Sequence, residues 1–338
     1  MATTTDSIGR VLARRYRIES ALGSGTSATV YAAWDTVLQR RVAVKVLHPG
    51  LAGDGSFLRR FRYEAQSAAA LTHPHVLSVY DWGEDDRGPF LVLEYLGGGS
   101  LRDLLDDGRR LSVAQAAAVG VQAAGALAYA HGRGFVHRDI KPANLVFDED
   151  GRLRIADFGL ARALAEAAMT EPAGATVGTA RYAAPEQALG KAVDGRADVY
   201  ALALVLYEAV TGVVPFSADT TAATLMARVG ATLPGHDGLG PLAAVLDDAA
   251  APELDRRIDA LALADRLNEL GHGLATPEPL PLAGAGGRGL AQAGARAIDR
   301  TEHGMGPVLD LPLEGAPPAP DAFDAMALAT AVGVAAAD

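Results

Sequence analysis

The first part of the chain alternates between hydrophobic and polar positions. A period of two is typical of β-strands that bury one face, since successive side chains in a strand point to opposite sides. The strands expected from this pattern lie at about 16–24, 28–35, 41–48, 76–82 and 89–95. A glycine-containing turn separates the first two, which favours an antiparallel pair. The first part of the chain is therefore predicted to be a small antiparallel sheet.

Three later segments change to the longer period of an α-helix. Residues 56–71 return apolar side chains to one face at spacings of three and four, and Glu64 falls on that same face. Residues 112–133 are rich in alanine and apolar almost all round, which predicts a buried helix. Residues 194–212 predict a second core helix, and weaker helices follow to about residue 270.

The composition changes after about residue 270. Residues 271–325 are rich in Gly, Ala and Pro, which is typical of a flexible and partly extended linker. The final apolar stretch has only 13 residues, fewer than the roughly 18 that a membrane-spanning helix needs. An interaction module with its own fold is the alternative, and the Pro and Gly content argues against it. We expect residues 271–338 to form a disordered linker or tail.

Bulk properties exclude several classes of function. The net charge of −11 and the lack of a basic block argue against a nucleic-acid partner. The chain has no Cys, which excludes disulfide frameworks and thiolate-bound metals. Its first residues carry no apolar signal segment, and no run reaches about 18 apolar residues. We therefore expect a soluble, cytoplasmic protein without a membrane span in this chain.

The candidate chemistry is concentrated between His137 and Gly159, in the stretch HRDIKPANLVFDEDGRLRIADFG. Two short apolar strands joined by a DEDG turn bring the two ends of this stretch together. The groups expected to meet there are Asp139, Lys141, Asn144 and Asp157. They provide an acid, a cation and two oxygen ligands suited to a hard divalent metal such as Mg²⁺. Phosphoryl transfer from a nucleotide requires this set of groups.

The rarity of Lys and Asn in this chain supports this interpretation. The chain contains three Lys and two Asn, yet Lys141 and Asn144 occur within four residues of each other. Arg cannot replace a Lys that must act as a compact point charge on a phosphate. Chance placement is the alternative, and the spacing of the surrounding residues argues against it.

The sheet carries a second group of candidates. Gly23 and Gly25 lie in the first turn, where glycines let backbone N–H groups approach phosphate oxygens; alone, such a turn is weak evidence. Lys45 lies in the apolar strand V-A-V-K and needs an anionic partner or a phosphate. A snorkelling edge lysine is the alternative. We expect an ion pair between Lys45 and Glu64, although a solvated surface Glu is the simpler interpretation of Glu64.

Taken together, these motifs resemble the signature set of protein kinases over about residues 10–270. The resemblance implies an α+β, two-lobed kinase fold, with a small antiparallel lobe carrying one helix and a larger, mainly helical lobe. It implies that Asp139 orients and deprotonates a substrate hydroxyl, that Lys141 stabilises the transferring phosphoryl group, and that Asn144 and Asp157 hold Mg²⁺, with Mn²⁺ as a substitute. The residues implied to bind ATP are Leu22, Gly23, Gly25, Val30, Ala43, Lys45, Glu64, Glu94, Leu96, Asn144 and Asp157. The pattern departs from the family at Ala28, which stands at the third glycine of the glycine-rich loop.

The segment after Gly159 resembles a kinase activation segment that ends in GTARYAAPE. HRD-x-K-P-x-N is the serine/threonine form of the catalytic motif, and Arg138 marks kinases in which that Arg holds a phosphorylated loop. The candidate phosphosites are Thr170 and Thr176. Related bacterial kinases often carry a T-x-T pair here, and Ala173 at its second position departs from that pattern.

Structural roles also follow from the resemblance. Asp198 is expected to hold the backbone of the HRD motif, and Glu186 is expected to pair with Arg257. The implied domains are a leader at 1–15, an N-lobe at 16–96, a C-lobe at 97–270 and the tail at 271–338.

The resemblance implies a bacterial, eukaryotic-like (Hanks-type) serine/threonine kinase of the actinobacterial receptor-kinase group. It would act on proteins in signal transduction, phosphorylate its own activation loop and form a homodimer that does so in trans. If the natural chain continues past Asp338, it can be tethered to a membrane. A pseudokinase scaffold would lack one of the catalytic groups, and all are present. A small-molecule phosphotransferase of the antibiotic-kinase type would lack the GTxxYxxPE segment.

Overall fold

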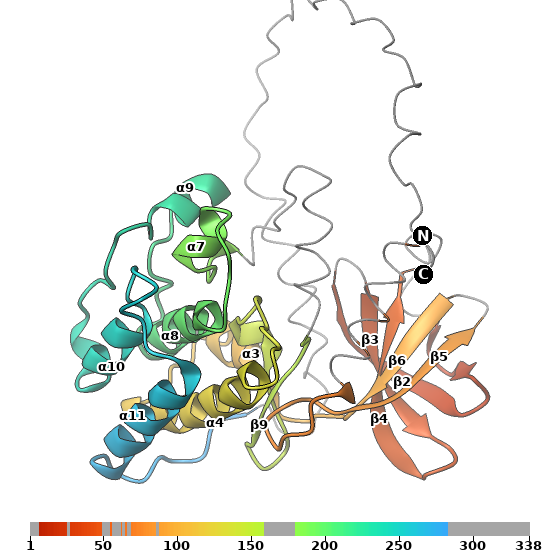
Figure 1. The fold of residues 1–338 in the computed structure, drawn as a ribbon. Helices are drawn as coiled ribbons and strands as arrows, with labels where there is room; N and C mark the ends of the chain where they lie inside the picture. Colours follow the sequence, from red (N-terminus) through yellow and green to blue (C-terminus); the bar gives the residue numbers. More distant parts are fainter. Residues whose placement is uncertain are drawn as a thin grey trace, which may run out of the picture. The chain divides into compact units, whose positions relative to one another are not determined.

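The computed structural model describes residues 7–25, 28–48, 55, 62, 65, 69–85, 88–158 and 180–282. All of them belong to one compact unit of the chain, residues 1–301. Strands dominate the described residues up to Leu93, and helices dominate those after Ser100 (Figure 1).

The first part is a six-stranded antiparallel sheet with the strand order β1-β2-β3-β4-β6-β5. Its strands are β1 (Val11–Leu12), β2 (Tyr16–Ser24), β3 (Ala28–Asp35), β4 (Arg40–Leu47), β5 (Val79–Asp85) and β6 (Gly88–Leu93). The alternating pattern therefore located β2, β3, β4 and β6 closely. It placed β5 three residues too early, at 76–82. Most of the helix expected at 56–71 lies outside the described residues.

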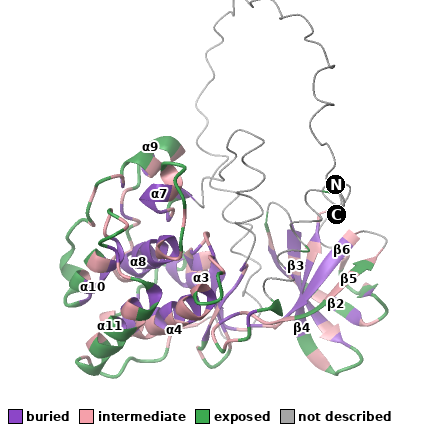
Figure 2. Ribbon diagram, viewed as in Figure 1, coloured by how far each residue is buried: buried purple, intermediate pink, exposed green. Residues whose placement is uncertain are grey.

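The central strands of this sheet are buried on both faces, not on one as the alternating pattern suggests (Figure 2). One face packs Tyr16, Ile18 and Tyr31 with side chains from β4 and β6. The opposite face packs Leu22 and Ala43 with Leu91 and Leu93. The second face is the one that carries the candidate nucleotide-binding residues.

The second part combines helices with a small three-stranded sheet of order β7-β8-β9. The strands are β7 (Gly99–Ser100), β8 (Leu145–Phe147) and β9 (Leu153–Ile155). The α-helices are α3 (Leu101–Asp106), α4 (Val113–His131), α7 (Pro185–Ala188), α8 (Arg196–Thr211), α9 (Thr221–Met226), α10 (Leu242–Ala249) and α11 (Ala260–His272). Short 3₁₀ helices lie at Pro142–Asn144 and Asp237–Leu239.

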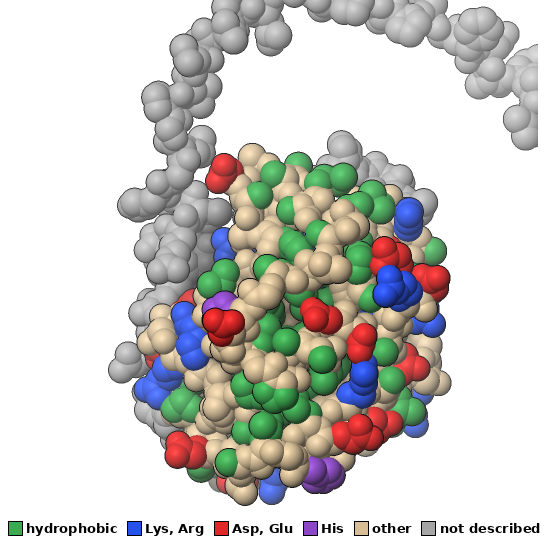
Figure 3. All heavy atoms as spheres, turned by 90° about the vertical axis from the view of Figure 1, so that its left-hand side faces the viewer, with side chains coloured by type: hydrophobic (Ala, Val, Ile, Leu, Met, Phe, Trp, Pro, Cys, Tyr) green, Lys and Arg blue, Asp and Glu red, His purple; other side chains and the backbone are tan. Residues whose placement is uncertain are grey.

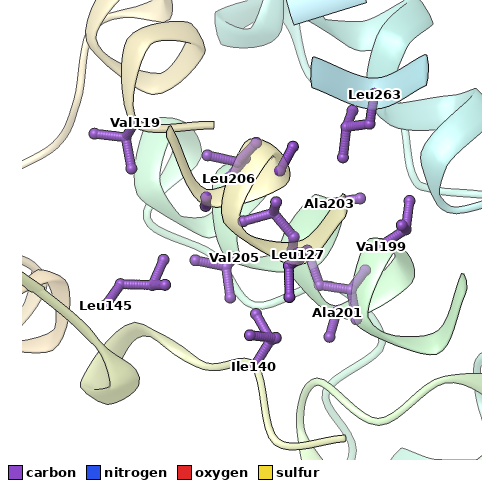
Figure 4. Close-up of a cluster of buried hydrophobic side chains, with 14 of the residues drawn as sticks. Val119, Leu127, Ile140, Leu145, Val199, Ala201, Ala203, Val205, Leu206 and Leu263 are labelled. Carbon is purple, nitrogen blue, oxygen red and sulfur yellow. The ribbon is translucent and has the colours of Figure 1, made fainter. Parts of the chain in front are cut away.

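Helices α4, α8 and α11 form the centre of the second part, around the buried side chains shown in Figure 4. Ser112 and Gln115 form a capping box that begins α4, and the helix ends at Gly132. Gly120 brings α4 close to its neighbours, because a Cβ at this position would lie 2.6 Å from Leu267 Cδ1 and 2.9 Å from Leu206 Cδ1. The sequence prediction of two core helices is confirmed by α4 and α8.

Among the described residues, α4 is long and apolar enough to cross a membrane by length and composition. Nine of its residues are buried inside the protein. It packs against α8 and α11, so its apolar surface is explained by the protein core.

After α11 ends, the chain stays in contact with the surface of the second part. Residues 274–282, which we call the docking segment, lie against α4 and the residues before it. Gln115 Nε2 donates to the carbonyl of Glu278 at 3.1 Å, and Arg109 Nη1 donates to the carbonyl of Pro281 at 3.1 Å. Leu280 and Leu282 pack against the hydrophobic core. The composition assigned this segment to a disordered tail, whereas the structure places it on the domain. Residues 283–338 lie outside the described residues.

Candidate active site

Three functional groups lie together on the loop that precedes β8. Lys141 Nζ is 2.7 Å from Asp139 Oδ2. The side-chain nitrogen of Asn144, Nδ2, donates to the backbone carbonyl of Asp139 at 2.8 Å and to the Oδ2 of Asp139 at 3.3 Å. The 3₁₀ turn Pro142–Asn144 returns the chain on itself, which is why residues five positions apart are in contact. The structure thus brings an acid, a cation and an amide to one place.

Asp157 joins this group through the pairing of β8 with β9. Leu145 is opposite Ile155 in the ladder, and the amide of Ala156 donates to the carbonyl of Asn144 at 2.9 Å. Asp157 is therefore the next residue after Ala156, whose backbone is hydrogen-bonded to Asn144. The strand–turn–strand prediction is confirmed at the level of the backbone.

Lys45 connects the first sheet to this group. Its side chain is buried in β4 and its Nζ lies 2.9 Å from Asp157 Oδ1. Burial alone would raise the pKa of the Asp157 carboxyl, but the charges of Lys45 and Lys141 outweigh it and hold that pKa below its usual range. The expected partner, Glu64, lies outside the described residues, so the Lys45–Glu64 ion pair stays a prediction.

Two residues of the site adopt left-handed backbone conformations that are uncommon for residues other than glycine. Arg138 has φ +65° and Asp157 has φ +62°. Asp198, at the start of α8, accepts hydrogen bonds from the amides of His137 at 2.8 Å and Arg138 at 2.6 Å. Gln187 of α7 donates to the carbonyl of Arg138 at 3.1 Å. Such strain persists only where the surroundings hold it in place, which is typical of functional sites.

One face of the first sheet presents the apolar residues expected around a nucleotide. Leu22, Ala43 and Leu93 are buried in one cluster, with Val30 packed against it. Ala43 and Lys45 are two residues apart on β4, so both point to this face. Gly23 lies opposite Val30 in the β2–β3 ladder, and the amide of Gly25 donates to the carbonyl of Ala28 at 2.8 Å. The tip of this hairpin, residues 26–27, lies outside the described residues.

A small pocket lies where this face meets β9. Its lining residues are Leu77, Val79, Leu91, Leu93, Ile155, Asp157 and Phe158. The lining is apolar apart from Asp157, whose carboxylate pairs with Lys45. Leu93, which closes the buried cluster around Leu22 and Ala43, belongs to this lining.

The connection between the two parts is held by ion pairs that the sequence analysis did not identify. Arg154 of β9 lies 3.2 Å from the Glu94 carboxylate and 3.8 Å from that of Asp148. The amide of Glu94 donates to the carbonyl of Ser78, and Leu96 is buried against Val146 and Ala156. Glu94 was expected to bind ATP; its side chain also pairs with Arg154. A single charge in an otherwise apolar strand does not indicate which residue it pairs with.

The donor set fits a magnesium ion that also binds phosphates. Among the described residues, no group of three or more His, Cys, Asp or Glu could hold a metal by itself. The amide nitrogen of Asn144 is engaged with Asp139, which leaves its oxygen to bind a cation beside the Asp157 carboxylate. Mg²⁺ is usually bound by one or two protein oxygens together with substrate phosphates and water.

Helix α7 is anchored by a buried ion pair. Arg257 Nη1 and Nη2 lie 2.7 and 3.1 Å from the two carboxylate oxygens of Glu186, as the sequence analysis expected. Tyr182 donates to Glu208 at 2.6 Å, and Glu208 also pairs with Arg102 at 2.8 Å. Glu208 is a buried carboxylate that the sequence analysis missed, although a lone acid in an apolar helix is a signal for one.

The candidate phosphosites cannot be placed. Thr170 and Thr176 lie outside the described residues, as does Thr179. Arg138, the expected phosphate-binding residue, has a buried Nε without a hydrogen-bond partner among the described residues.

The helical side of the surface carries charges of both signs. Figure 3 shows acidic and basic side chains interspersed on this face, and no basic patch gathers there.

Comparisons with known proteins show the family to which the chain belongs. The family described as "Protein kinase domain" matches residues 16–233. The chain is 38% identical over 307 residues to serine/threonine-protein kinase PknL of Mycobacterium tuberculosis, covering 88% of this chain and 77% of that protein. It is 36% identical over 277 residues to PrkC of Bacillus subtilis, covering 78% of this chain and 43% of that protein.

A solved structure is similar as well. The crystal structure of the PknI kinase domain of Mycobacterium tuberculosis aligns with a TM-score of 0.61 and 34% sequence identity. The alignment covers 79% of this chain and 98% of that domain. The expected α+β kinase fold is therefore confirmed.

Proposed function

This chain belongs to the protein kinase family, and we propose that the groups meeting at Asp139 carry its chemistry. The chain is a bacterial serine/threonine protein kinase of the Hanks type, an ATP-dependent enzyme that requires a divalent metal. The observation that carries the residue assignment is the contact of Asp139, Lys141 and Asn144, linked through Asp157 to Lys45.

Asp139 is the base of the proposed mechanism. It orients a Ser or Thr hydroxyl and accepts its proton as the hydroxyl oxygen attacks the γ-phosphorus of ATP. The bond from that phosphorus to the leaving oxygen of ADP breaks at the same time. Lys141, 2.7 Å from the same carboxylate, stabilises the negative charge on the transferring group.

Asn144 and Asp157 are the proposed metal ligands. Their oxygens suit Mg²⁺, and Mn²⁺ accepts the same donors. When bound, the metal neutralises charge on the phosphate oxygens of ATP. The lowered pKa of Asp157 supports this role, because the carboxylate stays ionised throughout the neutral range.

The proposed ATP site is the face of the sheet that carries Lys45. Leu22, Val30 and Ala43 contact the adenine, and the backbone of Glu94 and Leu96 bonds its edge. The amides of Gly23 and Gly25 approach the phosphates. Lys45 binds the α- and β-phosphates and is held by Glu64. The shared apolar cluster around Leu22 and Ala43 supports this arrangement.

Regulation by activation-loop phosphorylation is the next part of the proposal. Thr170 and Thr176 are the proposed sites of autophosphorylation, which a homodimer carries out in trans. The Nε of Arg138 is buried and has no hydrogen-bond partner in the described part of the chain, which supports a phosphate-binding role because phosphate pairs well with guanidinium. The kinase phosphorylates proteins in bacterial signal transduction, and we place its catalytic domain in the cytoplasm, where ATP is available.

The test is phosphoryl transfer from γ-labelled ATP with Mg²⁺, using the full chain. The acceptors are the protein itself and a generic basic protein, with Asp139→Asn as the inactive variant. Asp150→Asn is the matched control, because Asp150 is largely exposed and lies outside the site. We expect label on Ser or Thr for the wild type and the control and none for Asp139→Asn. Equal label from Asp139→Asn would exclude the proposed base.

A further inference from the structure

Arg228 is the largest fully buried side chain of the described residues, and the catalytic mechanism does not use it. It follows α9. Its Nε donates to the carbonyl of Thr224 at 3.2 Å within the same turn, and its Nη1 donates to the carbonyl of Ala183 at 2.6 Å. Arg228 therefore connects the region of α9 to the segment that begins α7, 45 residues earlier in the sequence.

The burial of this guanidinium is not compensated by a carboxylate among the described residues. Its Nη2 is buried without a hydrogen-bond partner there, and so is the hydroxyl of Tyr200. Burial lowers the pKa of Arg228 below its usual value, which shows that its charge is held in an unfavourable place. An apolar side chain of similar length would fill the same space without this cost. Stability therefore does not explain why Arg is present here.

The hydrogen bond to Ala183 leads toward the catalytic loop. The amide of the next residue, Ala184, donates to Oε1 of Gln187 at 2.8 Å. Nε2 of Gln187 in turn donates to the carbonyl of Arg138 at 3.1 Å. Arg138 directly precedes Asp139. A continuous series of hydrogen bonds thus runs from Arg228 through residues 183–187 to the residue beside the proposed base.

We propose that Arg228 is a positioning residue for the protein substrate. Its guanidinium fixes residues 183–187 relative to the catalytic loop, so that a docked Ser or Thr lies at Asp139. This inference rests on the kinase function above and on the peptide-binding role that the kinase resemblance implies for the GTARYAAPE motif, which ends in Ala184-Pro185-Glu186. It does not involve the nucleotide, because Arg228 has no contact with the residues of the proposed ATP site among those described.

The test compares Arg228→Met and Arg228→Lys with the wild type, all as full chains. Met keeps the length and volume and removes the donors; Lys keeps the charge and one donor. We expect Arg228→Met to raise KM for a protein substrate by about 10-fold, the effect of losing one hydrogen bond from a charged group. KM for ATP should stay within about twofold, and Arg228→Lys should recover part of the loss. The melting temperature of Arg228→Met should not fall, because an uncompensated charge is removed.

A second measurement does not depend on activity. Amide hydrogen exchange over residues 180–190 should accelerate in Arg228→Met, while exchange in α4 stays unchanged. Unchanged exchange over 180–190 would overturn the proposal whether or not the protein transfers phosphate. A lower melting temperature with both KM values unchanged would show a structural role only and would also overturn it. Absence of transfer by the wild type would count against the kinase function instead, and the exchange result would still decide the role of Arg228.

Discussion

Asp198, the third residue of helix α8, accepts a 2.6 Å hydrogen bond from the backbone amide of Arg138. The two residues are 60 positions apart in the sequence. The same carboxylate accepts from the amide of His137 and lies 2.8 Å from His131 Nε2. Arg138 has a left-handed backbone conformation, which costs about 1–3 kcal/mol. The conformation of the catalytic loop is therefore imposed by a core helix rather than by the loop itself.

Asp198→Asn should lower activity without weakening ATP binding. An Asn has one acceptor oxygen and two donors, so one buried amide loses its partner at a cost of about 1–3 kcal/mol. We expect a lower melting temperature and a lower kcat, with KM for ATP nearly unchanged. Thermal unfolding and steady-state kinetics measure these effects, and Asp255→Asn on the exposed surface is the control. A fall in ATP affinity as large as the fall in kcat would contradict this interpretation.

Asp157→Asn should reveal a pH-dependent contribution to stability. The pKa of Asp157 is lowered in the folded protein from a usual value of 3.8, so the ionised form favours folding. Its contribution is fully present above that usual value and is lost as the pH falls through the lower folded pKa. Asn also tolerates the left-handed backbone at this position. The difference in unfolding free energy between wild type and variant should be constant from pH 5 to 8 and should shrink below about pH 4.

This pH dependence can be measured by urea unfolding at a series of pH values. Asp150→Asn, a change of the same chemistry at a largely exposed carboxylate, should show no comparable difference. A difference that grows on acidification would mean that the sign of the Asp157 shift is wrong.

Arg257→Met should destabilise the fold strongly, because it leaves the Glu186 carboxylate buried without its partner. Breaking a buried ion pair from one side costs about 3–5 kcal/mol. The neighbouring Arg256→Met is a matched control, since the Arg256 side chain is 77% exposed. The double variant Glu186→Leu, Arg257→Met should recover part of the loss, because no unpaired charge remains. Denaturant unfolding of the wild type, Arg257→Met, Glu186→Leu and the double variant gives the coupling energy directly, and additive losses would refute the pairing.

Two glycines of α4 should respond to alanine with opposite signs. Gly125 has no atom within 4 Å of an added Cβ, so Gly125→Ala should stabilise by about 0.5–1 kcal/mol through helix propensity. Gly120 has Leu267 and Leu206 in the space that a Cβ would occupy, so Gly120→Ala should destabilise by about 1–3 kcal/mol. Thermal unfolding distinguishes the two. Stabilisation by both changes would show that α11 packs more loosely than described.

The double variant Leu280→Ala, Leu282→Ala should release the docking segment from the domain. Both side chains are partly buried, so their loss should cost about 1–3 kcal/mol in unfolding free energy. Protease cleavage between Gly273 and Leu282 should become faster. The control is Leu261→Ala, because Leu261 is 62% exposed on α11. Equal cleavage rates in the wild type and the double variant would indicate that the segment is not held.

Much of the catalytic loop could be predicted because its chemistry is local in sequence. Asp139, Lys141 and Asn144 lie within six positions, and one strand–turn–strand unit adds Asp157. The contacts that hold this loop come from far away, and alternation or periodicity carries no information about them. Asp198 and the Glu186–Arg257 pair were expected only through family resemblance. Arg154 and Glu208 were missed because a charged residue in a buried strand or helix does not name its partner.

The docking segment shows a different limit of sequence reasoning. Pro and Gly content predicts a lack of helix and strand correctly, since Pro277, Pro279 and Pro281 cannot donate to a hydrogen-bond ladder. It does not predict a lack of contacts. A chain without regular structure can still be bound through its carbonyls, as Gln115 and Arg109 bind this one. The expectation of disorder from residue 271 treated a lack of helix and strand as if it were also a lack of contacts.

The position of Leu282 has a consequence for the reach of the chain that follows it. Leu282 Cδ1 lies 3.0 Å from where a Cβ on Gly98 would be, so the described chain ends beside the link between the two parts of the kinase domain. Residues 273–282 span about 33 Å when fully extended. Release of the docking segment therefore moves the last point at which the chain is attached to the domain from Leu282 to the end of α11. The unattached chain then becomes longer by up to that amount.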